Sequence, residues 1–160
     1  MIKLFHSTNV LFSKVELGKC NQYKDFGQAF YLTEDRKQAV EIASARVDIF
    51  GGTPIINEYD FDESLIRNGE LSCKKFDKYD EEWAEFIYNN RDETLCPPFN
   101  HSYDVVYGPI ANDRVGLQIR NFRQGNIDKK EFLRRLKYMK GITFQYAFCM
   151  LKAIEKLIRK

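Results

Sequence analysis

The side chains best suited to binding a ligand lie in two short segments near the start of the chain. In residues 2–8 the side chains alternate between the two faces of a predicted strand, and His6 stands near its end. In residues 26–33 the same alternation places Tyr31 on one face of a second strand. If these strands pair, an imidazole and a phenol lie side by side and could bind a ligand by hydrogen bonding and ring stacking. The alternative is that both rings only pack within the fold.

The spacing of apolar residues predicts the elements that would position these two segments. The predicted elements are a helix capped by Thr33 and continuing to about Phe50, a strand over 54–61, a helix over 80–91 and a strand over 103–110. The inward face of the first helix is expected to carry Ala39, Val40, Ala43 and Val47. Residues 65–80 are polar and predict a loop with a short helix, and Asn112–Asp113 is typical of a turn.

The last third of the chain predicts a helix, a short strand and a final helix. Asp128 and Glu131 resemble a capping box at the start of a helix that stops at Gly141, and its inward residues are Phe132, Leu133, Leu136 and Met139. Alternation over 142–146 predicts a strand that contains Gln145, and a helix is expected from about Phe148 to Ile158. A continuous helix over 143–158 also fits the spacing. Together these elements predict an α/β (α+β) fold.

Composition indicates one domain, residues 1–160, kept in a reducing cytoplasm. The chain has 160 residues, of which 44% are hydrophobic, so it can bury a real core. No apolar segment is long enough to span a membrane, and the first residues do not resemble a signal peptide. The four cysteines, Cys20, Cys73, Cys96 and Cys149, form no CxxC pair, so neither a zinc site nor a disulfide framework is expected.

Charge is distributed unevenly along the chain. Residues 114–160 hold 13 Lys+Arg and 3 Asp+Glu, about +10, whereas the preceding residues hold 12 Lys+Arg against 20 Asp+Glu, about −8. The positive part could attract an acidic partner, a nucleic acid or the pyrophosphate of a dinucleotide. The alternative is that these charges only solvate the outer faces of amphipathic helices.

The first two segments, taken as residues 4–8 and 25–33, resemble the opening of the ADP-ribosyltransferase fold of the histidine–tyrosine class. Within that class the match is closest to a bacterial group catalogued as DUF3990. Residues 83–91, 103–115 and 144–148 support the resemblance in the same order, so it spans nearly the whole chain. It implies a small split mixed β-sheet with flanking helices.

The resemblance also implies roles for individual residues. In that class the histidine binds a ribose hydroxyl of NAD and the tyrosine stacks on nicotinamide, which are the roles expected of His6 and Tyr31. The implied NAD-binding residues are His6, Ser7, Thr8, Gly27 and Tyr31, with the backbone of Ser7 holding the nicotinamide amide. Ser7 and Ala29 stand where the family usually has glycine, and their β-carbons narrow the approach of a ligand to the backbone.

Two residues compete for the third catalytic position. Many relatives of this fold place a glutamate there, and Glu85 lies in a segment that superficially resembles the glutamate strand. Helical spacing over 80–91 instead turns Glu85 away from Trp83 and Ile87, so we expect Gln145 to face the cleft and Glu85 to face solvent. A glutamine can accept a hydrogen bond from a ribose hydroxyl but supplies no negative charge. The alternative is that Gln145 is a structural residue.

These inferences predict an enzyme that transfers ADP-ribose from NAD to an unknown macromolecular acceptor, protein or nucleic acid, and releases nicotinamide without a metal. Relatives in the group resemble toxins encoded beside small partner proteins, so the resemblance implies a cognate antitoxin as a further partner. Two alternatives remain. The chain could be a degenerate transferase fold that binds NAD or a partner protein, as Ser7, Ala29 and Gln145 indicate. It could instead act on RNA through its basic part, like the RNA 2′-phosphotransferases.

Overall fold

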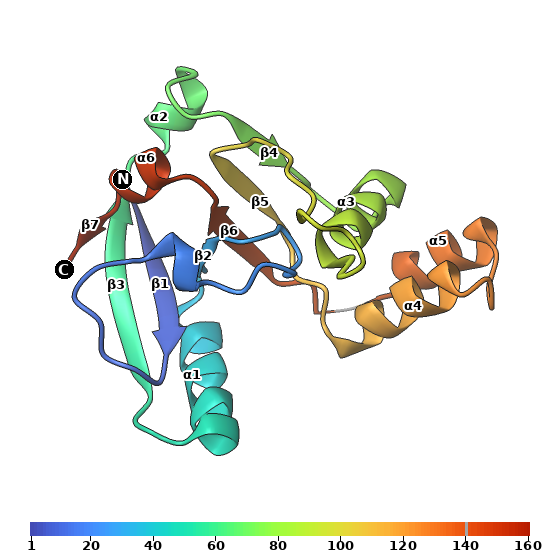
Figure 1. Ribbon diagram of the computed structural model, residues 1–160, viewed down its shortest axis with the longest axis horizontal. Helices are drawn as coiled ribbons and strands as arrows, with labels where there is room; N and C mark the ends of the chain where they lie inside the picture. Colours follow the sequence, from blue (N-terminus) through green and yellow to red (C-terminus); the bar gives the residue numbers. More distant parts are fainter. Residues whose placement is uncertain (140) are drawn as a thin grey trace.

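Two small β-sheets form the centre of the computed structural model, which describes residues 1–139 and 141–160 (Figure 1). In the first sheet, β3 (Ile55–Phe61) lies between β1 (Ile2–Thr8) and β7 (Ile158–Arg159), and both pairs are antiparallel. The second sheet has the order β2 (Phe30–Leu32), β6 (Phe144–Phe148), β5 (Val105–Pro109) and β4 (Cys73–Lys75), with only the last pair parallel among the described residues. The α+β class and the split mixed sheet predicted from the sequence are confirmed.

The two sheets meet where β1 passes the end of β2. The Phe5 amide donates to the Thr33 carbonyl at 2.8 Å, and the Thr33 amide donates back to the Phe5 carbonyl at 3.0 Å. The sheets diverge beside this bridge. His6 follows Phe5 directly and Tyr31 precedes Thr33 by two residues, so both lie at the opening between the sheets.

Helix α1 (Arg36–Phe50) packs on the first sheet (Figure 1). Its N-cap is Asp35, whose carboxylate accepts hydrogen bonds from the backbone amides of the first turn, so the prediction of Thr33 as the cap is wrong. Ala39 and Ala43 are fully buried, as expected, but Val40 is 41% exposed. The buried stripe consists of small residues, which lets the helix lie close to the sheet.

Helix α3 (Glu81–Arg91) confirms the prediction from helical spacing. Asp80 caps it by accepting a hydrogen bond from the Trp83 amide at 2.9 Å. Trp83 and Ile87 are completely buried, and the indole nitrogen of Trp83 donates to the Pro109 carbonyl of β5 at 3.1 Å. The helix is therefore attached firmly to the second sheet.

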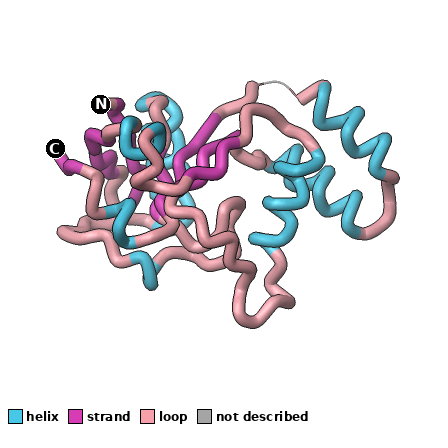
Figure 2. The backbone as a smooth tube through the Cα atoms, turned by 90° about the horizontal axis from the view of Figure 1, so that it is seen from above, coloured by secondary structure: helices cyan, strands magenta, loops and turns pink. Residues whose placement is uncertain are grey.

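Helices α4 (Asp113–Arg123) and α5 (Lys129–Lys137) form a hairpin that projects away from the sheets (Figures 1 and 2). Phe122 and Phe132 stack between them with ring centroids 4.7 Å apart. Asp128 caps α5 as predicted. Two predictions are wrong: Asn112 and Asp113 form the cap and first residue of α4 rather than a turn, and α5 ends at Lys137 rather than near Gly141. Lys140, within the expected helix, lies outside the described residues.

The core is divided by the second sheet. Leu4, Phe61 and Phe148 belong to a cluster between the two sheets, where Phe61 and Phe148 meet edge to face at 4.9 Å. Trp83, Phe132 and Ala147 belong to a cluster on the opposite face of the second sheet, which α3, α4 and α5 cover. Side chains alternate along β6, so Gln145 faces the same side as Ala147.

Two further parts of the chain differ from the sequence-based expectations. The segment expected to be a loop with a short helix contains α2 (Ser64–Arg67) and also the strand β4. The prediction of a final helix from about Phe148 to Ile158 is wrong, because α6 (Leu151–Ile154) has only four residues and Ile158 belongs to β7. A short 3-10 helix, Leu17–Lys19, lies in the long connection between β1 and β2. Within the described residues, no helix has the length and apolar character to cross a membrane.

Candidate functional site

A pocket of about 660 Å³ opens where β1 and β2 diverge. Its walls come from these two strands, the connection between them, α1, the end of α3, the residues after β5, and β6. The lining residues that carry polar or charged side chains are His6, Ser7, Lys19, Cys20, Asn21, Tyr23, Lys24, Asp25, Tyr31, Thr33, Arg46, Arg91 and Gln145. The pocket therefore gathers four residues predicted from sequence: His6, Ser7, Tyr31 and Gln145.

His6 is held in one tautomer by a backbone contact. Its Nδ1 lies 2.8 Å from the Tyr31 carbonyl oxygen, which can only accept a hydrogen bond, so Nδ1 must carry the proton. Burial lowers the pKa of His6 to about 4, with smaller contributions from the charges of Arg46 and Arg159. At neutral pH the ring is thus uncharged, and Nε2 is a hydrogen-bond acceptor. The ring neighbours of His6 are Phe30, at 4.2 Å, and Phe12, at 5.8 Å.

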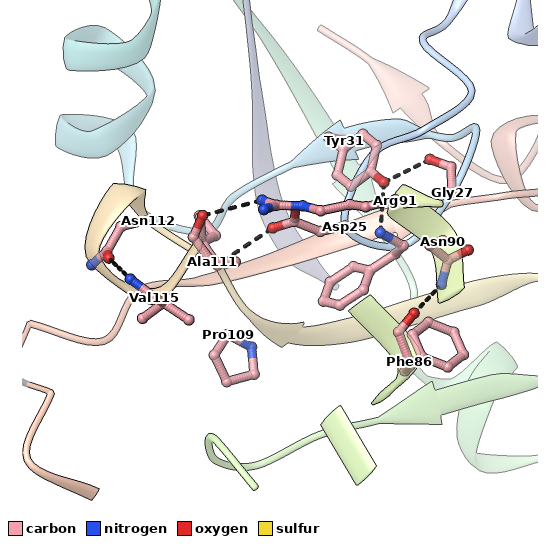
Figure 3. A network of polar contacts seen from close by, with 12 residues as sticks. Asp25, Gly27, Tyr31, Phe86, Asn90, Arg91, Pro109, Ala111, Asn112 and Val115 are labelled. Atoms are coloured by element: carbon pink, nitrogen blue, oxygen red, sulfur yellow. Dashed lines mark hydrogen bonds and ion pairs between the residues drawn. The ribbon is translucent and has the colours of Figure 1, made fainter. Parts of the chain in front are cut away.

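The hydroxyl of Tyr31 is bound to the loop that precedes β2. It donates to the Gly27 carbonyl at 2.7 Å and accepts from the Phe26 amide at 3.0 Å (Figure 3). The Tyr31 and Phe26 rings are stacked, with centroids 6.5 Å apart. Burial raises the pKa of the phenol well above its ordinary value. The hydroxyl is therefore structural, and the part of Tyr31 that remains for a ligand is its ring.

An ion pair connects three separate segments at the wall of the pocket. Asp25 is 7% exposed, and its carboxylate accepts from the Arg91 Nε at 2.7 Å and from the Ala111 amide at 3.1 Å (Figure 3). Arg91 also donates to the Ala111 carbonyl at 3.4 Å. The network fixes the loop before β2, the end of α3 and the start of α4 relative to one another. Since both oxygens of Asp25 are engaged, this carboxylate is not free for a ligand.

The pocket lining carries a positive charge. Asp25 is its one carboxylate among the described residues, whereas Lys19, Lys24, Arg46 and Arg91 are cationic. Lys19 is paired with Glu16 and Arg91 with Asp25, which leaves Lys24 and Arg46 without an ion pair in the described part of the chain. Burial, followed by the charge of Arg46, lowers the pKa of Lys24. Sequence reasoning missed Lys24 and Arg46, because no local pattern distinguishes them from other surface cations.

Gln145 and Glu85 lie in different surroundings. Gln145 lies opposite Gly108 in the antiparallel pair of β6 and β5, and it lines the pocket. Glu85 is exposed on α3 and is outside the pocket lining. The helix predicted over 80–91 explains the difference, because Trp83 and Ile87 occupy the buried face of α3 and turn Glu85 toward solvent.

The remaining predicted NAD-binding residues contribute mainly to local structure. The Ser7 hydroxyl donates to the Ala39 carbonyl at 2.6 Å, which turns its side chain toward α1. Thr8 contacts Val10 through its hydroxyl and, like Gly27, is outside the pocket lining formed by the described residues. Ala29 is 3% exposed and does line the pocket.

Gly27 has a structural requirement of its own. Its φ is +83°, and a β-carbon built on it would lie 2.9 Å from Oδ1 of Asn90. Asn90 is 1% exposed, and its Nδ2 donates to the Phe86 carbonyl at 2.8 Å (Figure 3). Gly27 is therefore needed for the packing of its loop against α3.

Within the described residues, no group of three or more His, Cys, Asp or Glu side chains is arranged to hold a metal ion. The four cysteines are all free, and burial raises the pKa of Cys20, which lines the pocket. A thiol with a raised pKa is a poor nucleophile at neutral pH.

The fold and the pocket together define an α+β domain with a cation-lined pocket at the opening of a split sheet. The chain belongs to the DUF3990 family, described as a protein of unknown function, whose sequence profile matches residues 2–158. This match confirms the family assignment made from the sequence. No curated protein and no solved structure matches the chain significantly.

Proposed function

We propose that the protein transfers ADP-ribose from NAD to a macromolecular acceptor. In this reaction the bond between C1′ of the ribose and the nicotinamide nitrogen breaks, and nicotinamide leaves with the bonding electron pair. A nucleophile of the acceptor forms a new bond to C1′ and loses its proton to solvent. The catalytic requirement is to hold the dinucleotide and to stabilise the positive charge that develops on the ribose.

The observation that carries this proposal is the gathering of His6, Tyr31 and Gln145 in one cation-lined pocket. These residues are 25 and 114 positions apart along the chain, and their order is that of the resemblance described above, which His6 and Tyr31 also match in type. The volume of about 660 Å³ lies within the range typical of ligand-binding clefts.

Five of the lining residues suit parts of NAD. The unprotonated Nε2 of His6 accepts a hydrogen bond from a ribose hydroxyl, and the ring of Tyr31 offers an aromatic face to nicotinamide. Lys24 and Arg46 supply positive charge for the pyrophosphate. The Gln145 amide accepts from the second ribose hydroxyl and orients the sugar.

A second candidate function is binding of NAD without turnover. Two features of the pocket favour it. Asp25, the one carboxylate in the lining formed by the described residues, is already bound to Arg91 and Ala111. The residue proposed for the third catalytic position, Gln145, is neutral. Such a site lacks the negative charge that stabilises an oxocarbenium-like state. In either case the family resemblance suggests a toxin that a small cognate antitoxin neutralises.

Nicotinamide release from NAD tests the proposal. Gln145→Ala should cut the rate with a modest change in affinity, and Gln145→Glu should keep or raise the rate, because it adds the charge that the transition state prefers. Glu85→Gln is the matched control and should have little effect, since Glu85 is exposed on α3.

Calorimetry with NAD separates the two candidates. Heat of binding without nicotinamide release by the parent chain supports the binding module, and release that appears only in Gln145→Glu supports it further. Absence of binding by the parent contradicts both. Loss of release in Glu85→Gln, with Gln145→Ala unaffected, would show that the third catalytic residue is Glu85.

A further inference from the structure

The positive charge of the last third of the chain divides into two regions with different surroundings. Near the C-terminus, the cations are neutralised by acidic residues from earlier in the chain. Lys152 pairs with Asp104 at 2.9 Å, Lys156 pairs with Glu70 at 2.6 Å, and Lys160 pairs with Asp60. These charges are therefore used by the fold itself. The excess positive charge that remains lies on the hairpin of α4 and α5.

Within the hairpin, the cations that face α3 also have partners. Lys129 pairs with Glu81 at 2.5 Å at the start of α3. Arg123 lies 3.8 Å from the Asp92 carboxylate, and its guanidinium stands 3.9 Å from the centre of the Tyr88 ring. These contacts attach the hairpin to α3.

The outer faces of the two helices carry unpaired cations. Arg114, Arg120, Lys130 and Lys137 are exposed, and no ion pair involves them in the described part of the chain. The spacing of these residues follows from helical geometry. On α4, Arg114 and Arg120 stand three residues on either side of Leu117, on the face opposite the buried Val115 and Ile119.

On α5 the cations form a regular stripe. Lys130, Arg134 and Lys137 follow the i, i+4, i+7 spacing of one helix face, opposite the buried Phe132 and Leu136. Arg134 shares Glu131 with Arg135 but remains well exposed. Lys137 is followed directly by Tyr138, whose side chain is 68% exposed.

We propose that the outer faces of α4 and α5 bind single-stranded nucleic acid. Rows of unpaired cations match a repeating phosphate backbone, and exposed rings beside them provide stacking surfaces for bases. Tyr138, which directly follows Lys137 at the end of α5 and is 68% exposed, is such a ring. An exposed ring beside the cations favours a nucleic acid over an acidic protein, which would need cations but no stacking surface.

The hairpin begins beside the pocket. Ile110 and Ala111 line the pocket and come directly before Asn112, the cap of α4. A strand bound along the hairpin therefore has one end near the opening between the sheets. Binding of the strand stands independently, whereas its role as the acceptor of ADP-ribose rests on the proposed function.

Fluorescence anisotropy of the full chain with labelled single-stranded RNA and DNA of about 16 nucleotides tests the proposal, without NAD. The logarithm of the binding constant should fall against the logarithm of salt concentration with a slope of about −3, as expected for roughly four phosphate contacts. The variant R114E/R120E/K130E/K137E should bind at least about tenfold more weakly, with a slope near zero. Tyr138→Ala should weaken binding about fivefold or more.

The matched control is K14E/R36E/K37E/K78E. The four cations that it replaces are also exposed and belong to no ion pair of the described residues. Each of the two variants lowers the net charge by 8, from +2 to −6. The control should keep most of the affinity, since its charges lie outside the hairpin. If the fourfold hairpin variant is unfolded by circular dichroism, the double variants R114E/R120E and K130E/K137E replace it.

Three results overturn the proposal: no binding by the parent, equal losses in the hairpin variant and the control, or displacement of RNA by an equal charge of polyglutamate. Nicotinamide release measured without nucleic acid should be unchanged in the hairpin variant, because its four residues lie outside the pocket lining. A parent that binds RNA but releases no nicotinamide therefore contradicts the transferase and leaves the nucleic-acid surface in place.

Discussion

The neutral state of His6 depends on atoms contributed by distant parts of the chain. Its Nδ1 proton is fixed by the carbonyl of Tyr31 and its pKa is lowered by burial, with the charges of Arg46 and Arg159 acting in the same direction. A neutral imidazole can accept a hydrogen bond at any pH above its titration. The residue is therefore suited to binding a hydroxyl rather than to donating a proton at neutral pH.

This environment predicts a pH dependence of stability. The folded pKa of His6, about 4, lies below the unfolded value of about 6.5, so its contribution to stability is complete above pH 6.5 and is lost as the pH falls toward 4. Between pH 7 and pH 5 the loss should be on the order of 2 kcal/mol. His6→Gln removes this contribution, so urea unfolding should show a smaller loss in the variant than in the parent. His101 remains in both proteins, and equal losses would contradict the buried, neutral His6.

The strand positions of His6 and Gln145 were predictable from alternation, although a continuous helix over 143–158 fitted the spacing of Gln145 as well, and only the family resemblance placed the two residues in one cleft. A period of two placed His6 at the end of a strand and Gln145 in the middle of another, and a period of 3.6 turned Glu85 outward. Lys24 and Arg46 were not predictable in this way. Their place in the pocket depends on how the loop before β2 and the helix α1 pack, which is decided by contacts far apart in the sequence.

At the scale of elements, the loop that carries Gly27 is held against α3 by close packing. Gly27 has a positive φ and approaches Asn90, while the Tyr31 hydroxyl binds the carbonyl of the same glycine. The loop also carries Asp25, which binds Arg91 at the end of α3. One wall of the pocket is consequently rigid only while this loop stays packed.

Gly27→Ala should destabilise the protein more than Gly69→Ala. Both glycines have a φ near +80°, but a β-carbon at Gly69 meets nothing within 4 Å, whereas one at Gly27 meets Asn90 at 2.9 Å. Backbone strain alone costs about 1 kcal/mol, and overpacking at Gly27 should add about 1–2 kcal/mol. Urea unfolding of the two variants measures the difference, and equal losses would show that Asn90 moves aside freely.

The elements that sequence reasoning misplaced are those determined by long-range pairing. Ile154 and Ile158 have helical spacing, yet the backbone of residues 158–160 pairs with β3, where the Lys160 amide donates to the Glu58 carbonyl at 3.0 Å. The helix α4 was missed because Asn112–Asp113 has the composition of a turn, although asparagine is equally common as a cap. By contrast, α3 has an N-cap and a buried stripe of its own, and these local signals were sufficient to predict it.

At the scale of the whole molecule, the cluster between the sheets holds the two halves of the pocket together. Leu4 of β1, Phe61 of β3 and Phe148 of β6 are all completely buried there. His6 lies on β1 and Gln145 lies on β6, so the position of one residue relative to the other depends on this cluster. The pocket is therefore as stable as the packing beneath it.

Phe148→Ala should lower the free energy of unfolding by about 3–5 kcal/mol, because it leaves a cavity against Phe61. Phe50→Ala is the control, since Phe50 is 71% exposed at the end of α1 and its loss should cost less than about 0.5 kcal/mol. Chemical denaturation of both variants provides the comparison. Similar values would mean that the two sheets are not held together by this contact.

The strand order has a consequence for protein synthesis. His6 and Tyr31 leave the ribosome early, but β2 pairs with β6, and the first sheet is completed by β7, which contains residues 158 and 159. Pairing between segments far apart along a chain is slow and must wait until both segments have been translated. A nascent chain that has not yet reached β6 therefore carries the first half of its pocket without the second.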